Sequence, residues 1–237
     1  MIVYQQLLLG LTQSVLLFLK NKDIYTKEVI VIDYEKEILG AQKVEHLLSG
    51  LIGNATLSGR LFSENVVLKI FELCGAYWMH DGNPESPHAE LTGGKCSNGF
   101  FNCLKVLKYV QLSDFLAQQL ALLIRKEIGR TKVDWVIGSP MAGITFSHDV
   151  ARILGAKVSF FTEKDPKRSK KMLWDREAIP EGETVLQIEE LITTSLTLIN
   201  VQEAIIEGNP CPVNFLPFIG TLIHRPDKLP VHEYGGR

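Results

Sequence analysis

A pair of adjacent carboxylates precedes a run of hydroxyl side chains in the segment Thr184–Thr197, TVLQIEELITTSLT. If a buried strand ends at Glu189 and Glu190 and a helix then begins, the helix start presents free N–H groups and a positive dipole end, which bind anions. Hydroxyls that could add hydrogen bonds to a phosphate belong to Thr193, Thr194, Ser195 and Thr197. The carboxylates could accept hydrogen bonds from sugar hydroxyls. The segment therefore fits a phosphorylated ribose, and it also fits a surface acidic pair before an ordinary helix N-cap.

A second segment, VIGSPMAG at Val136–Gly143, joins a short apolar run to a loop of small residues. Main-chain N–H groups in such a loop can approach an anionic ligand without a side-chain clash. Many loops of α/β proteins have this composition, so the segment alone is a weak signal. The loop consists of Ser139, Pro140, Met141, Ala142 and Gly143.

A cation and two aromatic rings lie close together in LTGGKCSNGFFN, the segment Leu91–Asn102. Lys95 would offer positive charge to an anionic ligand, and Phe100 and Phe101 would offer ring faces to a planar one. The alternative is that both rings belong to the core and that Lys95 is solvated.

A long basic segment, Phe161–Glu183, separates two predicted strands. Loops of this length inside a compact domain are usually functional or disordered. Its cationic residues are Lys164, Lys167, Arg168, Lys170, Lys171 and Arg176.

These segments belong to a pattern of alternating strands and helices. Short apolar runs predict strands at Val133–Ile137, Lys157–Phe161, Thr184–Ile188 and Phe215–Leu222. Amphipathic spacing predicts helices at Leu112–Ile128, Ile144–Leu154 and Leu198–Glu207. This alternation predicts an α/β fold with a mostly parallel sheet flanked by helices. In such a sheet ligands lie beyond the carboxyl ends of the strands, where the acidic, small-residue and basic segments all begin.

Residues 1–60 are predicted to form a helical N-terminal extension, because apolar positions recur at helical spacing through Leu7–Leu19 and Ile38–Leu51. Ser63 is a predicted N-cap of a helix that runs to Leu73. Polar residues interrupt the first apolar run and no Lys or Arg precedes it, so neither a membrane span nor a secretory signal is expected. A cytoplasmic location follows as an expectation.

Composition excludes several classes of protein. Of 237 residues, 46% are hydrophobic and 22% charged, as in globular domains, and the net charge of −2 gives no reason to expect a nucleic-acid partner. The four cysteines form no CxxC pair or zinc spacing, and the histidines are scattered, so no protein-held metal site is expected.

The acidic segment resembles the signature of the type I phosphoribosyltransferases, in which two acids and a Thr-Thr-Gly-Gly-Thr turn hold ribose hydroxyls and a 5′-phosphate. By this resemblance Glu189 and Glu190 hold the ribose, and Thr193–Thr197 holds the phosphate. The sequence departs from the pattern at Glu190, where Asp is usual, and at Ser195 and Leu196, which replace glycines.

The other segments extend this resemblance over residues 63–225. Val136–Gly143 is similar to the family's pyrophosphate loop. Leu91–Asn102 is similar to the base-binding segment of the orotate phosphoribosyltransferases, although Lys95 stands where Arg is usual. The resemblance implies an anionic pyrimidine, with Lys95 near its carboxylate and Phe100 and Phe101 at the base. The basic segment is similar to the family's mobile lid, whose cations reach the pyrophosphate, in some members across a dimer interface. Catalytic roles are therefore expected for Lys164, Lys167, Glu189 and Glu190.

The resemblance implies transfer of a phosphoribosyl group from 5-phosphoribosyl 1-diphosphate to orotate or a related base, with Mg²⁺ carried by the diphosphate. It also implies a homodimer and a domain at 61–237 with a base-binding hood at 76–105. Two alternatives remain: a non-catalytic sensor that binds the sugar diphosphate, and the same chemistry on a purine or another pyrimidine.

Overall fold

The structure, a computed structural model, describes residues 2–3, 34–51, 59–90, 96–168 and 171–225. The helix predicted at Leu7–Leu19 and the candidate cation Lys95 lie outside these ranges. Within them, no helix has the length and apolar content needed to cross a membrane.

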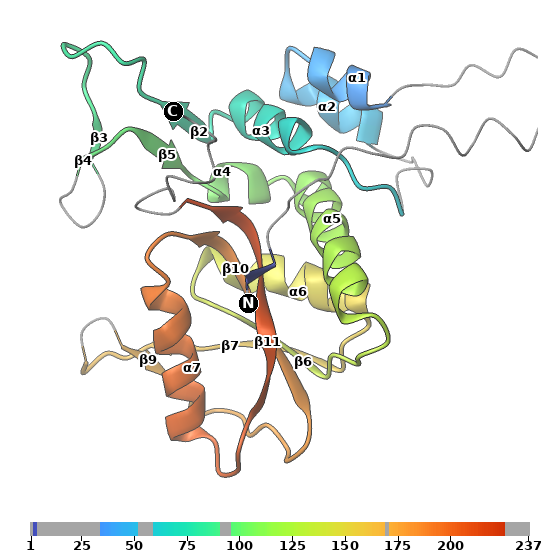
Figure 1. Cartoon of the computed structure of the whole chain (residues 1–237), viewed down its shortest axis with the longest axis vertical. Coiled ribbons are helices and arrows are strands. Elements are labelled where there is room, and N and C mark those ends of the chain that lie inside the picture. The colour runs from blue at the N-terminus through green and yellow to red at the C-terminus, as the bar shows by residue number, and fades with distance from the viewer. Residues whose placement is uncertain (1, 4–33, 52–58, 91–95, 169–170, 226–237) are drawn as a thin grey trace, which may run out of the picture.

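A five-stranded sheet forms the centre of the fold (Figure 1). Its strand order is β1-β11-β10-β6-β7, and every neighbouring pair is parallel. The strands are β1 (Ile2–Val3), β6 (Trp135–Gly138), β7 (Val158–Phe161), β10 (Thr184–Ile192) and β11 (Asn214–His224). The predicted α/β fold with a mostly parallel sheet is confirmed.

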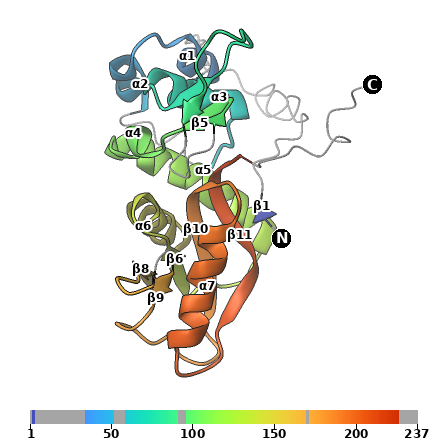
Figure 2. The same cartoon turned by 90° about the vertical axis from the view of Figure 1, so that its left-hand side faces the viewer.

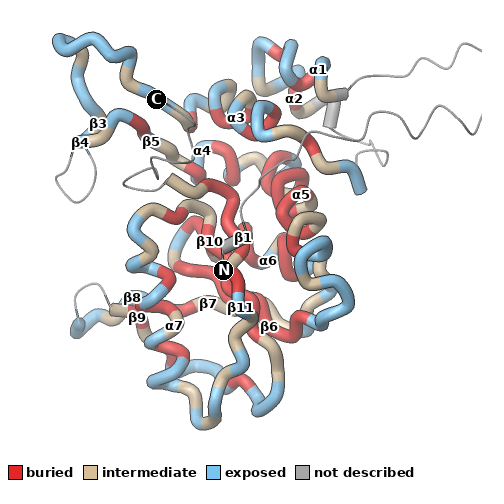
Figure 3. The backbone as a smooth tube through the Cα atoms, in the orientation of Figure 1, coloured by how far each residue is buried: buried red, intermediate tan, exposed pale blue. Residues whose placement is uncertain are grey.

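Helices cover both faces of this sheet, as Figures 1 and 2 show for α7 on one side and α5 on the other. They are α5 (Val110–Ile128), α6 (Ala142–Leu154) and α7 (Leu196–Gly208). Because strand side chains alternate between faces, Val136 and Ile188 join the larger core with α5 and α6, whereas Ile137 and Val185 join a smaller core with α7. Figure 3 shows the resulting buried strands.

Four further helices of the described residues precede α5 in the chain. They are α1 (Tyr34–Gly40), α2 (Val44–Leu51), α3 (Glu64–Leu73) and α4 (Leu104–Leu107). Ile38 and Leu47 are buried in the same core as α3 and α5, so the described part of the extension packs on the domain. Ser63 is the N-cap of α3, as predicted, and its hydroxyl donates to Glu35, which ties α3 to α1.

Short antiparallel pairs complete the fold. In the hood, β2 (Tyr77–Met79) pairs with β5 (Gly99–Phe101), and β3 (Ala89–Glu90) pairs with β4 (Cys96–Ser97). In the basic segment, β8 (Glu163–Lys164) pairs with β9 (Met172–Leu173). The hood therefore contains two short antiparallel strand pairs.

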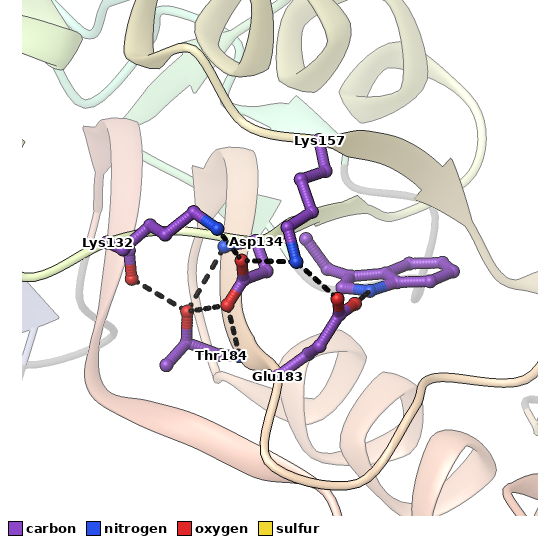
Figure 4. A network of polar contacts seen from close by, with 6 residues as sticks. Lys132, Asp134, Lys157, Glu183 and Thr184 are labelled. Carbon is purple, nitrogen blue, oxygen red and sulfur yellow. Dashed lines mark hydrogen bonds and ion pairs between the residues drawn. The ribbon is translucent and has the colours of Figure 1, made fainter.

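An ion-pair network closes the amino-terminal edge of the sheet (Figure 4). Asp134 Oδ1 lies 2.8 Å from Lys132 Nζ and 3.0 Å from Lys157 Nζ, and its Oδ2 accepts from the Thr184 N–H at 3.1 Å. Lys157 also pairs with Glu183 at 2.5 Å. The hydrogen bond from Lys132, followed by that from the Thr184 amide, lowers the pKa of Asp134 below its ordinary value. Since this edge is opposite the carboxyl ends of the strands, the network serves the fold.

Candidate functional site

The carboxyl ends of β6, β10 and β11 lie at the edge of the sheet that faces the hood (Figure 1). Cys103, at the start of α4, places its thiol 3.5 Å from the carbonyl oxygen of Glu190. The predicted ligand loops after β6 and β10 are therefore brought together beneath the predicted base-binding hood, where ligands of parallel sheets bind.

Glu189 and Glu190 lie near the end of β10 and project to opposite faces of the sheet. Glu189 shares the α7-facing side with Gln187, whose side chain donates to the Leu198 carbonyl at 3.3 Å. Glu190 shares the α6-facing side with Ile188 and approaches Gly143. The two carboxylates thus flank the end of one strand instead of lying side by side on one surface.

Both carboxylates are shielded from water. Glu189 is 3% exposed, and burial raises its pKa to about 8, with the negative charge of Glu190 acting in the same direction. Burial also raises the pKa of Glu190. Within the described ranges, Glu189 Oε1 and Glu190 Oε2 have no hydrogen-bond partner. Because a buried acceptor without a donor is costly, these two oxygens are the natural acceptors for a ligand's hydroxyls.

The loop after β6 contacts both carboxylates. Ser139 is buried and donates its hydroxyl hydrogen to Glu189 Oε2. A Cβ atom built on Gly143 would lie 3.1 Å from both Ser139 Oγ and Glu190 Oε2. The remaining residues of the loop differ: Ala142 is buried, Pro140 is half-buried, and Met141 is 76% exposed. Helix α6 begins at Ala142, earlier than the predicted Ile144, so Gly143 lies in its first turn. Ser139 from the loop and Gly143 from α6 therefore approach the acidic pair, a contact that the sequence did not predict.

Strand β10 is longer than predicted. It continues past Ile188 to Ile192, because its partner β11 also continues and pairs Leu191 with Ile223 and Ile192 with His224. The predicted end of the strand was therefore wrong, and the acidic pair belongs to the strand itself. Helix α7 also begins earlier than the predicted Leu198.

The turn after β10 leads directly into α7. Ser195 is the N-cap, in the left-handed conformation with φ 62°, where glycine would be unstrained. Leu196 is the first residue of the helix, and its side chain is 51% exposed. Thr193 is half-buried, whereas Thr194 and Thr197 are exposed. The first-turn N–H groups of a helix lack intrahelical acceptors, and those of α7 follow this turn directly.

The two aromatic rings of the hood face opposite ways. Phe101 packs on Phe71 and Tyr77 with ring centroids 5.8 and 4.8 Å apart. Phe100, paired across the hairpin with Trp78, is 39% exposed. Neighbouring strand residues alternate between faces, so only Phe100 of this pair presents its ring outward.

Arg225 is a cation that the sequence analysis missed. It follows β11, and its Nη1 donates to Ser97 Oγ at 2.6 Å and to the Gly99 carbonyl at 3.1 Å. Its backbone N–H donates to the Ile192 carbonyl at 2.8 Å, which joins the ends of β10 and β11 to the hood. Among described residues it has no carboxylate partner. Arg225 could have been predicted as a site residue, because it lies just beyond the carboxyl end of a predicted strand.

Lys170 lies outside the described residues, and the other cations of the basic segment divide into two groups. Three form ion pairs: Arg168 with Asp165 and Glu207, Lys171 with Glu203, and Arg176 with Glu163. Lys164 and Lys167 are exposed, and neither side chain has an acidic partner in the described part of the chain. The two predicted lid lysines are therefore available to an anion.

No group of three or more His, Cys, Asp or Glu residues that could hold a metal occurs within the described residues. The oxygens without partners on Glu189 and Glu190 are nevertheless hard donors of the kind that Mg²⁺ accepts beside a substrate's phosphates.

No protein-family model matches the chain. It is similar to the orotate phosphoribosyltransferase of Desulforamulus reducens, with 38% identity over 120 residues, 51% of this chain and 59% of the relative. It is similar to that of Thermoanaerobacter sp. (strain X514), with 30% identity over 161 residues, 68% of this chain and 75% of the relative. The chain thus spans less than two thirds of the first of these relatives.

Among solved structures, a UMP synthase from Leishmania donovani superposes with a TM-score of 0.50 and 15% identity. The superposition covers 67% of this chain and 31% of that one. At this identity the similarity concerns the fold.

Proposed function

This chain belongs to the orotate phosphoribosyltransferase family, and we propose that it transfers a phosphoribosyl group from 5-phosphoribosyl 1-diphosphate to orotate, releasing pyrophosphate. One observation carries the proposal: two buried carboxylate oxygens without partners among the described residues, on Glu189 and Glu190, lie near the end of β10, which the turn at Thr193–Ser195 joins to α7. Acceptors for ribose hydroxyls therefore adjoin N–H donors for a phosphate.

The proposed division of labour follows from these positions. Glu189 Oε1 and Glu190 Oε2 accept hydrogen bonds from the ribose hydroxyls, and the turn at Thr193–Thr197 holds the 5′-phosphate. The loop Ser139–Gly143 adjoins the pyrophosphate. Lys164 and Lys167 neutralise the charge that grows on the pyrophosphate as the glycosidic bond breaks.

In the hood, Phe100 stacks on the base. Arg225 supplies a fixed positive charge near the base and its carboxylate, because its guanidinium is held by Ser97 and Gly99. Phe101 supports the hood from the core, and Lys95 remains a candidate second cation. The division into an extension at 1–60 and a domain at 61–237 with a hood at 76–105 is part of the proposal, as is a homodimer.

Mg²⁺ would be carried by the diphosphate, and Glu189 and Glu190 would supply the carboxylate oxygens that could help to hold it. When bound, it supplies positive charge that stabilises the leaving pyrophosphate. Burial raises the pKa values of both carboxyl groups, and hydrogen bonds donated by the ribose hydroxyls would favour their ionised, hydrogen-bond-accepting forms.

A non-catalytic sensor is the second candidate, because Leu196 places a bulky side chain at the turn predicted to hold the phosphate. Pyrophosphate release with Mg²⁺, the sugar diphosphate and a panel of bases separates the candidates. We expect pyrophosphate release when orotate is the base and no release with the other bases. Pyrophosphate release with a purine would mean that the acceptor base is a purine. Binding of the sugar diphosphate by calorimetry without any pyrophosphate release would favour the sensor.

A further inference from the structure

We propose that Ser139 is a positioning residue, whose hydroxyl holds one oxygen of Glu189 and thereby aims the other at a ribose hydroxyl. This inference rests on the proposed function. It assigns the Ser139 side chain to the acidic pair, whereas the loop's main-chain N–H groups remain for the pyrophosphate.

The contact follows from the pairing of β6 with β10. Gly138 lies opposite Ile188 in the sheet, so Ser139 and Glu189 are the next residues along two parallel strands. Ser139 is 2% exposed and donates to Glu189 Oε2, while Glu189 Oε1 is buried without a partner in the described structure. One oxygen of the carboxylate is therefore engaged by the protein and the other is left for a ligand.

Glu189 needs an anchor for two physical reasons. A glutamate side chain has several rotatable bonds, and holding it in one rotamer costs conformational entropy unless a contact does so. The negative charge of Glu190 also acts on the same carboxyl group, and burial withholds water that would otherwise solvate it. A hydroxyl donor stabilises the ionised form and fixes its orientation, and Gln187 contributes more weakly in the same direction.

The environment leaves little room for another arrangement. A Cβ on Gly143 would lie 3.1 Å from Ser139 Oγ, so the serine hydroxyl lies between the first turn of α6 and the Glu189 carboxylate of β10. Replacement of Ser139 by Ala removes the donor without adding volume. Replacement by Thr retains the hydroxyl and serves as the conservative variant.

The test compares Ser139→Ala, Ser139→Thr and the control Ser147→Ala in the full chain. Ser147 is also buried and lies on α6, where its hydroxyl bonds to the Ile144 carbonyl at 2.9 Å. Calorimetry measures the Kd for 5-phosphoribosyl 1-diphosphate with Mg²⁺, and carboxyl-carbon NMR follows the titration of Glu189 without ligand. Steady-state kinetics gives KM for each substrate.

For Ser139→Ala we expect about tenfold weaker binding of the sugar diphosphate, the loss typical of a bond to a charged group. KM for orotate stays unchanged, the pKa of Glu189 rises, and Ser139→Thr restores most of the affinity. Folded Ser139→Ala with unchanged Kd and unchanged Glu189 titration overturns the inference. If the wild-type protein fails to bind the sugar diphosphate, the proposed function fails instead, and the titration still decides whether the hydrogen bond exists.

Discussion

The Cβ that a larger residue would add at Gly143 falls 3.1 Å from the Oε2 atom of Glu190, closer than an ordinary carbon–oxygen contact. Gly143 is the second residue of α6, and Glu190 reaches it from β10. The absence of a side chain at Gly143 therefore leaves the space that the Glu190 carboxylate uses.

We predict that Gly143→Ala weakens binding of 5-phosphoribosyl 1-diphosphate about tenfold, because the methyl group displaces a carboxylate that bonds to the ribose. Calorimetry measures the change. Gly40→Ala is the control, since a Cβ at Gly40 meets nothing within 4 Å. If folded Gly143→Ala binds the sugar diphosphate as tightly as wild type does, Glu190 is not part of the ribose site.

Stability should depend on pH through Glu189. Its pKa is raised from 4.5 to about 8, so between these values the folded protein holds a proton that the unfolded chain has lost. The free energy of unfolding therefore falls as pH rises through this window, by about 1.4 kcal/mol per pH unit for one such group, and levels off above it.

Urea unfolding at a series of pH values, for wild type and Glu189→Gln, checks this dependence. The difference between the two proteins isolates Glu189 from other titrating groups. Exposed Glu85→Gln is the control and should follow wild type. Parallel curves for wild type and Glu189→Gln between pH 5 and 8 would contradict the raised pKa.

The lid lysines should act on turnover. For Lys164→Ala combined with Lys167→Ala we expect kcat to fall about 10²-fold, with a smaller change in Kd for the sugar diphosphate, because charge on the pyrophosphate grows in the transition state. The control combines Lys126→Ala and Arg130→Ala, two exposed cations near the end of α5. Wild-type kcat in the lid variant would show that these lysines do not serve the reaction.

Leu196 is the position where the turn departs most from the phosphate loop it resembles. We predict that Leu196→Gly tightens binding of the sugar diphosphate, because the amide can approach the phosphate more closely, at a cost of up to about 1 kcal/mol in helix stability. Ile206→Gly, which also replaces an exposed apolar residue of α7 by glycine but at the other end of the helix, controls for this loss of helix stability. Weaker binding by a folded Leu196→Gly protein would mean that the side chain belongs to the pocket.

The network at the opposite edge should affect stability alone. Asp134→Asn removes the charge that Lys132 and Lys157 share, and we expect the free energy of unfolding to fall by about 1–3 kcal/mol, the usual worth of hydrogen bonds to a charged group. Asp114→Asn, which disrupts a surface pair with Arg152, should cost less than about 1 kcal/mol. A changed Kd for the sugar diphosphate would contradict the separation of the two edges.

The sequence was sufficient for the fold class and for most element positions, because these depend on local patterns. Apolar runs and helical spacing predicted β6, β7 and α5 close to their observed bounds. The end of β10 could not be found in this way, since its last residues are held by pairing with β11, and strand pairing is a non-local interaction.

The sequence also predicted that Glu189 and Glu190 are adjacent and that a helix follows them. Only the tertiary structure decided that Ser139 donates to Glu189 and that Arg225 joins the hood to the sheet. The physical reason is sequence separation: Ser139 and Glu189 are 50 positions apart in the chain, and Ser97 and Arg225 are 128 positions apart. Such contacts exist only once the sheet has assembled and burial has removed the competing water.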